Sequence, residues 1–114
     1  MDIYKTRAKL FYLLSLESRL QILDELRYGE ACVCHLQHCL QKPQAYVSQQ
    51  LRVLKDAEMV DTRRDSVNIF YRLADPLARG VLDLALGPID QARPTDPACP
   101  CPHCTAETEQ GENH

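Results

Sequence analysis

The chain has 114 residues, of which 45% are hydrophobic and 25% are charged, and its formal net charge is −3. These values are typical of one soluble globular domain, and they exclude a wholly disordered chain, a collagen-like repeat and a membrane bundle. No apolar run approaches the ~20 residues that a membrane-spanning helix needs. The N-terminal residues show no signal-peptide pattern. We therefore expect a cytoplasmic protein.

The spacing of apolar residues predicts two helices in the N-terminal part of the chain. The first is expected over residues 3–14. Ser15 and Ser18 are N-cap candidates for a second, amphipathic helix, in which leucines recur every three residues until Gly29 ends it.

Two further helices, over residues 31–40 and 43–57, follow and are joined by the tight connection Gln41-Lys42-Pro43. Pro43 fits the first position of the later helix, where its missing N–H costs nothing. This arrangement predicts a helix-turn-helix, whose second helix enters the major groove of DNA.

The outward positions of that second helix carry side chains suited to reading bases. Glutamine can pair with adenine and arginine with guanine, and alanine can touch the methyl group of thymine. The candidate DNA-binding residues are Gln44, Ala45, Ser48, Gln49, Arg52 and Lys55. A polar helix face that simply meets water is the alternative interpretation.

Alternating polar and apolar residues predict two strands, over residues 60–64 and 68–73, which form a hairpin through residues 65–66. Arg63 and Arg64 lie beside the polar tip of this hairpin. They would suit a wing that reaches DNA phosphates or the minor groove.

Basic residues concentrate in the same part of the chain. Residues 42–72 carry six Lys or Arg against four acidic residues, whereas residues 90–114 carry one arginine against five acidic residues. The local face, rather than the net charge, decides attraction to phosphates. An ordinary mixed surface gives the same count, so charge alone leaves both interpretations open.

A last helix is expected between Asp75-Pro76 and Gly87-Pro88. Beyond it, residues 90–114 contain four prolines, many acidic residues and no large apolar residue. We expect a folded DNA-binding and dimerisation domain over residues 1–89 and a flexible, acidic tail rich in proline and cysteine over residues 90–114.

Six cysteines form two groups, one in the expected third helix and one in the tail: Cys32, Cys34 and Cys39, then Cys99, Cys101 and Cys104. Cytosolic thiols stay reduced, so structural disulfides are the weaker interpretation. Clustered cysteines in a reduced compartment indicate metal, metalloid or redox chemistry.

Four segments together resemble the ArsR/SmtB family of metal-sensing repressors: residues 20–23 (LQIL), 32–36 (CVCHL), 47–54 (VSQQLRVL) and 70–73 (FYRL). The resemblance implies a mainly α (α+β) winged helix-turn-helix fold with about five helices and one β-hairpin wing. It also implies a homodimer, joined through the first and last helices, that sits on double-stranded operator DNA until an inducer releases it. Gln49 and Gln50 depart from the residues of many members, so the operator sequence does not follow.

Residues 32–34 match the Cys-Val-Cys box that arsenic-, cadmium- and lead-sensing members carry before the recognition helix. The third cysteine of the arsenic sensor corresponds to Gln37, and its nearest substitute is Cys39. Residues 1–31 contain no cysteine, so the N-terminal thiols that cadmium and lead sensors borrow are lacking. Residues 73–102 contain no histidine, so the last-helix zinc site of zinc sensors is not expected.

We expect the three tail cysteines to form at least one complete three-thiolate set by themselves, because three thiols within six residues of a flexible segment can wrap one ion. The predicted metal ligands are Cys99, Cys101 and Cys104, with Cys32 and Cys34 as helpers and His103 as an added nitrogen donor. Helix positions two residues apart point about 200° apart. Cys32 and Cys34 are therefore expected to bind only weakly or with a tail cysteine.

The remaining polar residues of this segment have simpler expected roles. Cys39 is expected to be buried as a small apolar residue. His35 and His38 are expected on an exposed polar face.

The sequence therefore predicts a repressor, and not an enzyme, that leaves its operator when arsenite, a related trivalent arsenical or antimonite binds its thiolates. No permanent cofactor is expected. Three alternatives stay open: a thiol-redox repressor on the same fold, a cadmium or lead sensor, and a zinc knuckle in the tail.

Overall fold

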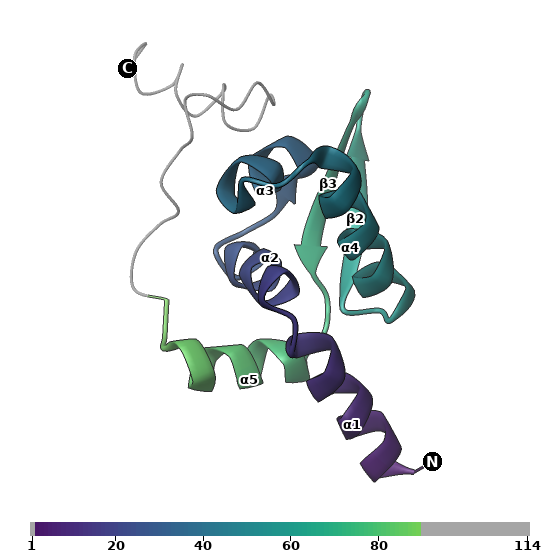
Figure 1. The fold of residues 1–114 in the computed structure, drawn as a ribbon, viewed down its shortest axis with the longest axis vertical. Helices are drawn as coiled ribbons and strands as arrows, with labels where there is room; N and C mark the ends of the chain where they lie inside the picture. The colour runs from purple at the N-terminus through teal and green to yellow at the C-terminus, as the bar shows by residue number, and fades with distance from the viewer. Residues whose placement is uncertain (1, 90–114) are drawn as a thin grey trace.

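The computed structural model describes residues 2–89. In chain order, this part forms α1 (Ile3–Leu14), α2 (Glu17–Arg27), β1 (Ala31–Cys32), α3 (Val33–Leu40), α4 (Gln44–Asp56), β2 (Val60–Asp65), β3 (Asn68–Leu73) and α5 (Pro76–Leu86) (Figure 1). The five helices and the hairpin confirm the predicted mainly α fold. None of the helices in this part of the chain has the length and apolar character that crossing a bilayer requires. The predicted tail lies outside the described residues.

The hydrophobic core lies where α2, α3 and α4 meet. Ile22, Leu36 and Leu51, one from each helix, are fully buried there. The apolar residues of α4 recur at Val47, Leu51 and Leu54, so one face of this helix is buried and the opposite face remains available. The core therefore determines which side of α4 meets solvent.

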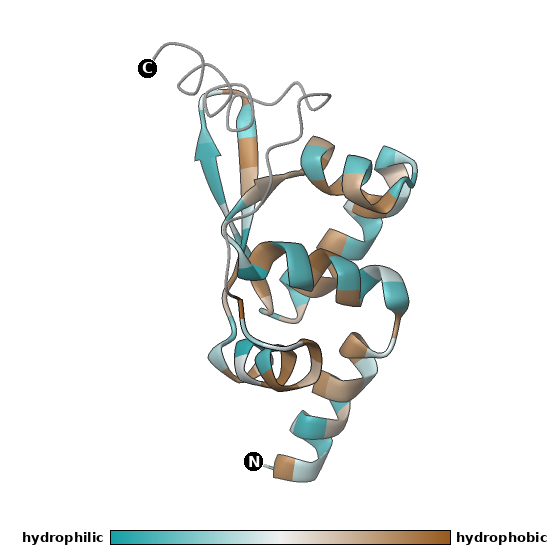
Figure 2. Ribbon diagram, turned by 90° about the vertical axis from the view of Figure 1, so that its left-hand side faces the viewer, coloured by the Kyte–Doolittle hydropathy of each residue, from teal (hydrophilic) through white to brown (hydrophobic). Residues whose placement is uncertain are grey.

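Helices α1 and α5 lie at the end of the molecule opposite the hairpin tip (Figures 1 and 2). Each buries only part of its apolar surface. The large apolar side chains that stay exposed on these two helices are Ile3, Tyr4, Phe11, Tyr12, Leu77, Leu84 and Leu86. Surface of this kind favours association between copies of a chain. The predicted dimerisation through the first and last helices stays a prediction.

The sheet has three antiparallel strands in the order β1-β3-β2, which is one strand more than expected. Ala31 and Cys32 pair with Tyr71 and Phe70 of β3, so the helix predicted from residue 31 begins only at Val33. Both Ala31 and Cys32 are buried, and their pairing occupies the free edge of β3. The prediction was wrong for these two residues because edge pairing outweighs their helical spacing.

The hairpin itself agrees with the predicted wing, with a small shift at its tip. Asp65 pairs with Asn68, so the turn lies at Ser66 and Val67, one residue later than expected. Ser66 adopts a left-handed backbone conformation with φ of 58°, which closes the turn.

The predicted serine caps of α2 are wrong. Its N-cap is Leu16, and no side chain makes a capping hydrogen bond there. The Ser15 hydroxyl instead donates to the Tyr12 carbonyl at the end of α1. The Ser18 hydroxyl accepts a hydrogen bond from the Tyr46 hydroxyl at 2.9 Å, which ties α2 to α4.

A buried arginine holds α5 against α2. The Arg27 guanidinium donates to Asp24 at the end of α2, to Asp83 in α5 at 2.9 Å, and to the Gly87 carbonyl at 2.7 Å. Burial alone would lower the pKa of Arg27, but the hydrogen bonds to Asp24 and Asp83 outweigh it and raise the pKa. Arg27 therefore stays charged and fixes the position of α5.

Candidate DNA interface and thiol site

The residues of α4 that were predicted to contact DNA lie together on its exposed side. Ala45, Ser48, Gln49 and Arg52 line one shallow concavity. Gln44 and Lys55 are exposed as well. This surface, which we call the α4 face, consists of the six predicted residues Gln44, Ala45, Ser48, Gln49, Arg52 and Lys55. It presents one cationic guanidinium, one ammonium and several groups that can donate or accept hydrogen bonds, as contact with DNA requires.

The turn between α3 and α4 orients this face. Gln41 ends α3 in a left-handed conformation with φ of 53°, and its amide donates to the Gln37 carbonyl. Pro43 then occupies the N-cap of α4 rather than the expected first helical position. The Lys42 ammonium lies 5.9 Å from the centre of the Tyr46 ring. A sharp connection of three residues thus joins the two helices at a defined angle.

The two arginines of the wing have different surroundings. Arg63 makes a two-pronged hydrogen bond with Glu30, with Nε to Oε2 at 3.0 Å, and its guanidinium stacks 4.9 Å from the centre of the Phe70 ring. The hydrogen bond with Glu30 raises the pKa of Arg63. Arg64 is exposed beside the tip. Arg63 is thus held by contacts within the protein, which stabilise the wing, whereas the exposed Arg64 is the more accessible of the two to a phosphate.

Cys32 and Cys34 come together at the junction of β1 and α3. Cys32 is the last residue of β1 and the N-cap of α3, with an extended backbone at φ −86° and ψ 167°. Its Sγ lies 2.8 Å from Sγ of Cys34, within hydrogen-bond distance. Sγ of Cys32 also accepts a hydrogen bond from the His35 amide at 3.4 Å. The expected divergence of about 200° assumed that both residues are helical, and it is wrong because Cys32 precedes the helix.

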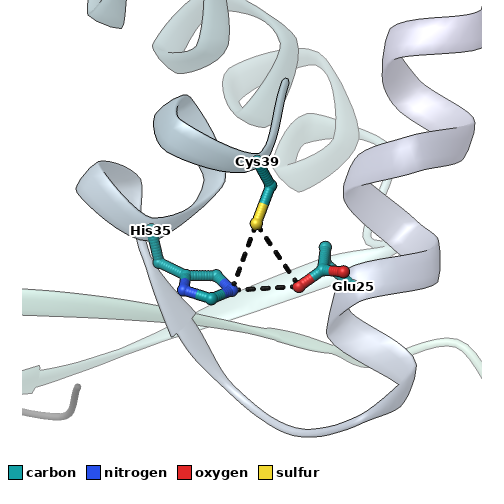
Figure 3. A group of neighbouring side chains, drawn as sticks. All are labelled: Glu25, His35 and Cys39. Carbon is teal, nitrogen blue, oxygen red and sulfur yellow. Dashed lines mark hydrogen bonds and ion pairs between the residues drawn. The ribbon is translucent and has the colours of Figure 1, made fainter. Parts of the chain in front are cut away.

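Two other expectations for α3 are wrong as well. Cys39 is exposed rather than buried. His35 is only 2% exposed, whereas His38 is exposed as expected. The His35 ring turns inward because Glu25 of α2 offers it a carboxylate at 2.9 Å, as Figure 3 shows. Glu25 was not among the residues predicted from the sequence. The one sequence feature that pointed to this group of side chains was the i, i+4 spacing of His35 and Cys39, which places them on the same face of α3.

The remaining predicted metal ligands, Cys99, Cys101 and Cys104, lie outside the described residues. The two acidic residues of the last helix region are already engaged in structural contacts. Asp75 caps α5 by accepting from the amides of Leu77 and Ala78, and Asp83 pairs with Arg27.

A helix-turn-helix formed by α3 and α4 and followed by the β2–β3 hairpin defines a winged helix-turn-helix domain. Residues 16–62 match the family described as bacterial regulatory protein, arsR family. The arsenical resistance operon repressor of Staphylococcus xylosus is 34% identical over 98 residues, which span 86% of this chain and 90% of that protein. The chain belongs to the arsR family of bacterial regulatory proteins, which are DNA-binding regulators and not enzymes.

Other relatives and solved structures extend this likeness. The transcriptional repressor SmtB homolog of Synechocystis sp. is 36% identical over 75 residues, which span 66% of this chain and 57% of that protein. Reduced HlyU from Vibrio cholerae superposes with a TM-score of 0.69 at 30% identity, over 71% of this chain and 85% of that one. The antimony-specific transcriptional repressor AntR superposes with a TM-score of 0.68 at 26% identity, over 100% of this chain and 91% of that one.

Proposed function

We propose that this protein represses transcription by binding operator DNA as a homodimer, and that it leaves the DNA when trivalent arsenic or antimony binds its cysteine thiolates. The observation that carries the proposal is the 2.8 Å approach of Cys32 and Cys34 beside the helix-turn-helix. The Staphylococcus xylosus relative is named for arsenical resistance, and AntR is described as antimony-specific. Both names support a metalloid as the inducer.

The thiol pair suits a soft ion, because thiolates favour thiophilic metals and metalloids. Trivalent arsenic takes three thiolates in a pyramid, so Cys32 and Cys34 would supply two and the tail one. The candidate third ligands are Cys99, Cys101 and Cys104. A methylated arsenical needs only two thiolates and would bind the pair without the tail.

The position of the pair connects it to both DNA-contacting elements. Cys32 pairs with Phe70 in β3 of the wing, and Cys34 lies in α3, which leads into α4 through the turn. An ion that bridges the two sulfurs therefore links the wing to the helix-turn-helix. An inducer acts only through unequal affinity for the DNA-bound and free states. A site at this junction meets that requirement if the wing and α4 move relative to each other on DNA.

The DNA would meet the α4 face and Arg64, and the dimer would form through the exposed apolar residues of α1 and α5. Two copies related by twofold symmetry would place their α4 helices in half-sites about one helical turn, ~34–36 Å, or a multiple of it apart. Phosphate contacts from Arg52, Lys55 and Arg64 would make the affinity fall steeply with salt.

The test is fluorescence anisotropy of the full chain on its own promoter fragment, titrated with arsenite, antimonite, cadmium, lead and zinc. We expect arsenite and antimonite to release DNA at the lowest concentrations. Cys32→Ser and Cys34→Ser should each abolish release, whereas Cys39→Ser serves as the matched control and should keep it. A full arsenite response in both Cys32→Ser and Cys34→Ser, or release by zinc at lower concentration than arsenite, would contradict the proposal.

A second candidate function is favoured by the same contact, because two thiols at 2.8 Å are also placed to form a disulfide. A peroxide would take two electrons and two protons from the Cys32–Cys34 pair, and one S–S bond would form. Hydrogen peroxide would be reduced to two water molecules, and an organic hydroperoxide to an alcohol and water. Mass spectrometry of the intact chain separates the two functions. The metalloid sensor gains an arsenic atom after arsenite treatment, whereas the redox sensor loses two hydrogens after peroxide treatment and releases DNA in that state.

A further inference from the structure

A second group of ligand atoms lies between α2 and α3, apart from the Cys32–Cys34 pair. Nε2 of His35 is 2.9 Å from Oε1 of Glu25, and Sγ of Cys39 is 3.4 Å from that nitrogen and 3.6 Å from that oxygen (Figure 3). Glu25 comes from α2, and the other two residues stand one turn apart on α3. We call these three residues the α2–α3 cluster.

These distances match the edges of a small coordination polyhedron. Zinc binds nitrogen and oxygen at about 2.0–2.2 Å and sulfur at about 2.3 Å, with tetrahedral angles. Those values place a nitrogen and an oxygen ligand about 3.3 Å apart, and a sulfur about 3.6 Å from either. The observed triangle has edges of 2.9, 3.4 and 3.6 Å, so a shift of a few tenths of an ångström would admit the ion.

The chemistry of the three donors is equally suited to a divalent cation. A carboxylate and a thiolate together carry two negative charges, which balance the ion, and a neutral imidazole completes a mixed O, N, S set of the kind zinc accepts. His35 is buried, so its ring is held in place, whereas Cys39 is exposed and leaves the cluster open to solvent. One side of the cluster is therefore pre-arranged, and the other side admits an ion from water.

We propose that Glu25, His35 and Cys39 bind one Zn²⁺ ion through a carboxylate oxygen, a ring nitrogen and a thiolate, with the fourth position open to water. The ion would join α2 to α3 and stabilise the folded protein. It would not by itself induce DNA release, because its ligands stand close to coordinating geometry without movement of the wing or of α4. The proposal is independent of the metalloid site and survives if that site fails.

The test uses the full chain with Cys99, Cys101 and Cys104 replaced by serine, so that these three thiols cannot supply sulfur. Co²⁺ serves as the spectroscopic probe for the zinc site. We expect one equivalent to bind and to give a sulfur-to-cobalt charge-transfer band. Adding Cys39→Ser should remove the band, and adding Glu25→Gln should weaken binding. His38→Gln, an exposed neighbour on the same helix, should change neither.

Thermal unfolding gives a second readout that does not depend on a thiol spectrum. Zinc at about 100-fold above its Kd should raise the Tm of the parent by roughly 10 °C. The same concentration should leave the Tm of the Cys39→Ser variant almost unchanged. The proposal is overturned if Cys39→Ser keeps the cobalt band while Cys34→Ser loses it, or if zinc stabilises the parent and the Cys39→Ser variant equally.

Discussion

Arg19 in α2 donates a hydrogen bond to Oε1 of Gln50 on the inner side of α4, at 3.3 Å, and both side chains are buried. The same guanidinium donates to the carbonyls of Leu13 and Tyr12 at the end of α1, at 2.7 and 3.2 Å. One side chain therefore joins the end of the expected dimerisation helix to the back of the expected recognition helix.

Removing that side chain should destabilise the fold. Arg19→Ala leaves two carbonyls and the Gln50 amide without their charged donor, which we expect to cost about 3 kcal/mol of unfolding free energy. Urea denaturation measures the loss. The matched control is Arg64→Ala, an exposed arginine whose removal should change stability by less than ~0.5 kcal/mol. Equal losses in the two variants would show that the buried network contributes nothing specific.

Base reading should depend on the α4 face. Gln49→Ala should weaken binding to the operator by about 1–3 kcal/mol while leaving binding to unrelated DNA almost unchanged, because an amide pairs with a base edge and not with phosphate. Competitive gel shifts with operator and unrelated duplexes measure both affinities. Equal loss on both duplexes would assign Gln49 to the backbone instead.

Arg64 of the wing should contribute to DNA affinity without contributing to sequence specificity. Arg64→Ala should weaken binding to operator and unrelated DNA alike and reduce the salt slope by about one unit. Arg63→Ala should additionally lower stability, because Arg63 holds Glu30 and stacks on Phe70. Affinities at a series of salt concentrations give the slopes, and an unchanged slope for Arg64→Ala would remove this residue from the interface.

The dimer should depend on the apolar residues of α5. Leu84 is 90% exposed in one copy of the chain. Leu84→Glu should convert the dimer to a folded monomer, because a dimer interface would bury the new charge. Sedimentation gives the mass and circular dichroism checks the fold. Val67→Glu, at a side chain that is 85% exposed on the hairpin tip, should leave the dimer intact. A dimeric Leu84→Glu variant would place the interface elsewhere.

The tail should matter for arsenite more than for a methylated arsenical. Replacing Cys99, Cys101 and Cys104 together by serine should raise the arsenite concentration for half-release at least tenfold, a change of about 1.4 kcal/mol. The response to a monomethyl arsenical, which needs two thiolates, should persist. If the triple variant keeps a full arsenite response while Cys32→Ser or Cys34→Ser abolishes it, the tail is not part of the site.

The helices could be predicted because each spans enough residues to show a helical period. Strand β1 could not, because the two residues Ala31 and Cys32 are too few to show a period and their pairing partner lies about forty residues later in the chain. The missed strand explains the missed thiol geometry. A helical Cys32 points away from Cys34, whereas an extended Cys32 brings the two sulfurs together.

Burial in α3 was predicted less well for a related reason. A histidine on a mixed helix face gives no sign of its orientation, and the residue that turns His35 inward, Glu25, belongs to another helix. The outward face of α4 was easier to predict, because the apolar residues Val47, Leu51 and Leu54 determine which side is buried. The spacing of residues within one helix therefore predicted the buried face of α4, whereas the burial of His35 depended on a contact with another helix.

His35 takes part in both candidate ligand sites, since its backbone amide donates to Sγ of Cys32 while its ring contacts Glu25 and Cys39. Any coupling that this shared residue carries between the two sites must be reciprocal. Whatever factor zinc at the α2–α3 cluster imposes on arsenite affinity, arsenite must impose the same factor on zinc affinity. A factor other than one would make zinc shift the metalloid concentration at which the protein leaves DNA, and a factor of one would leave the two ions to act separately.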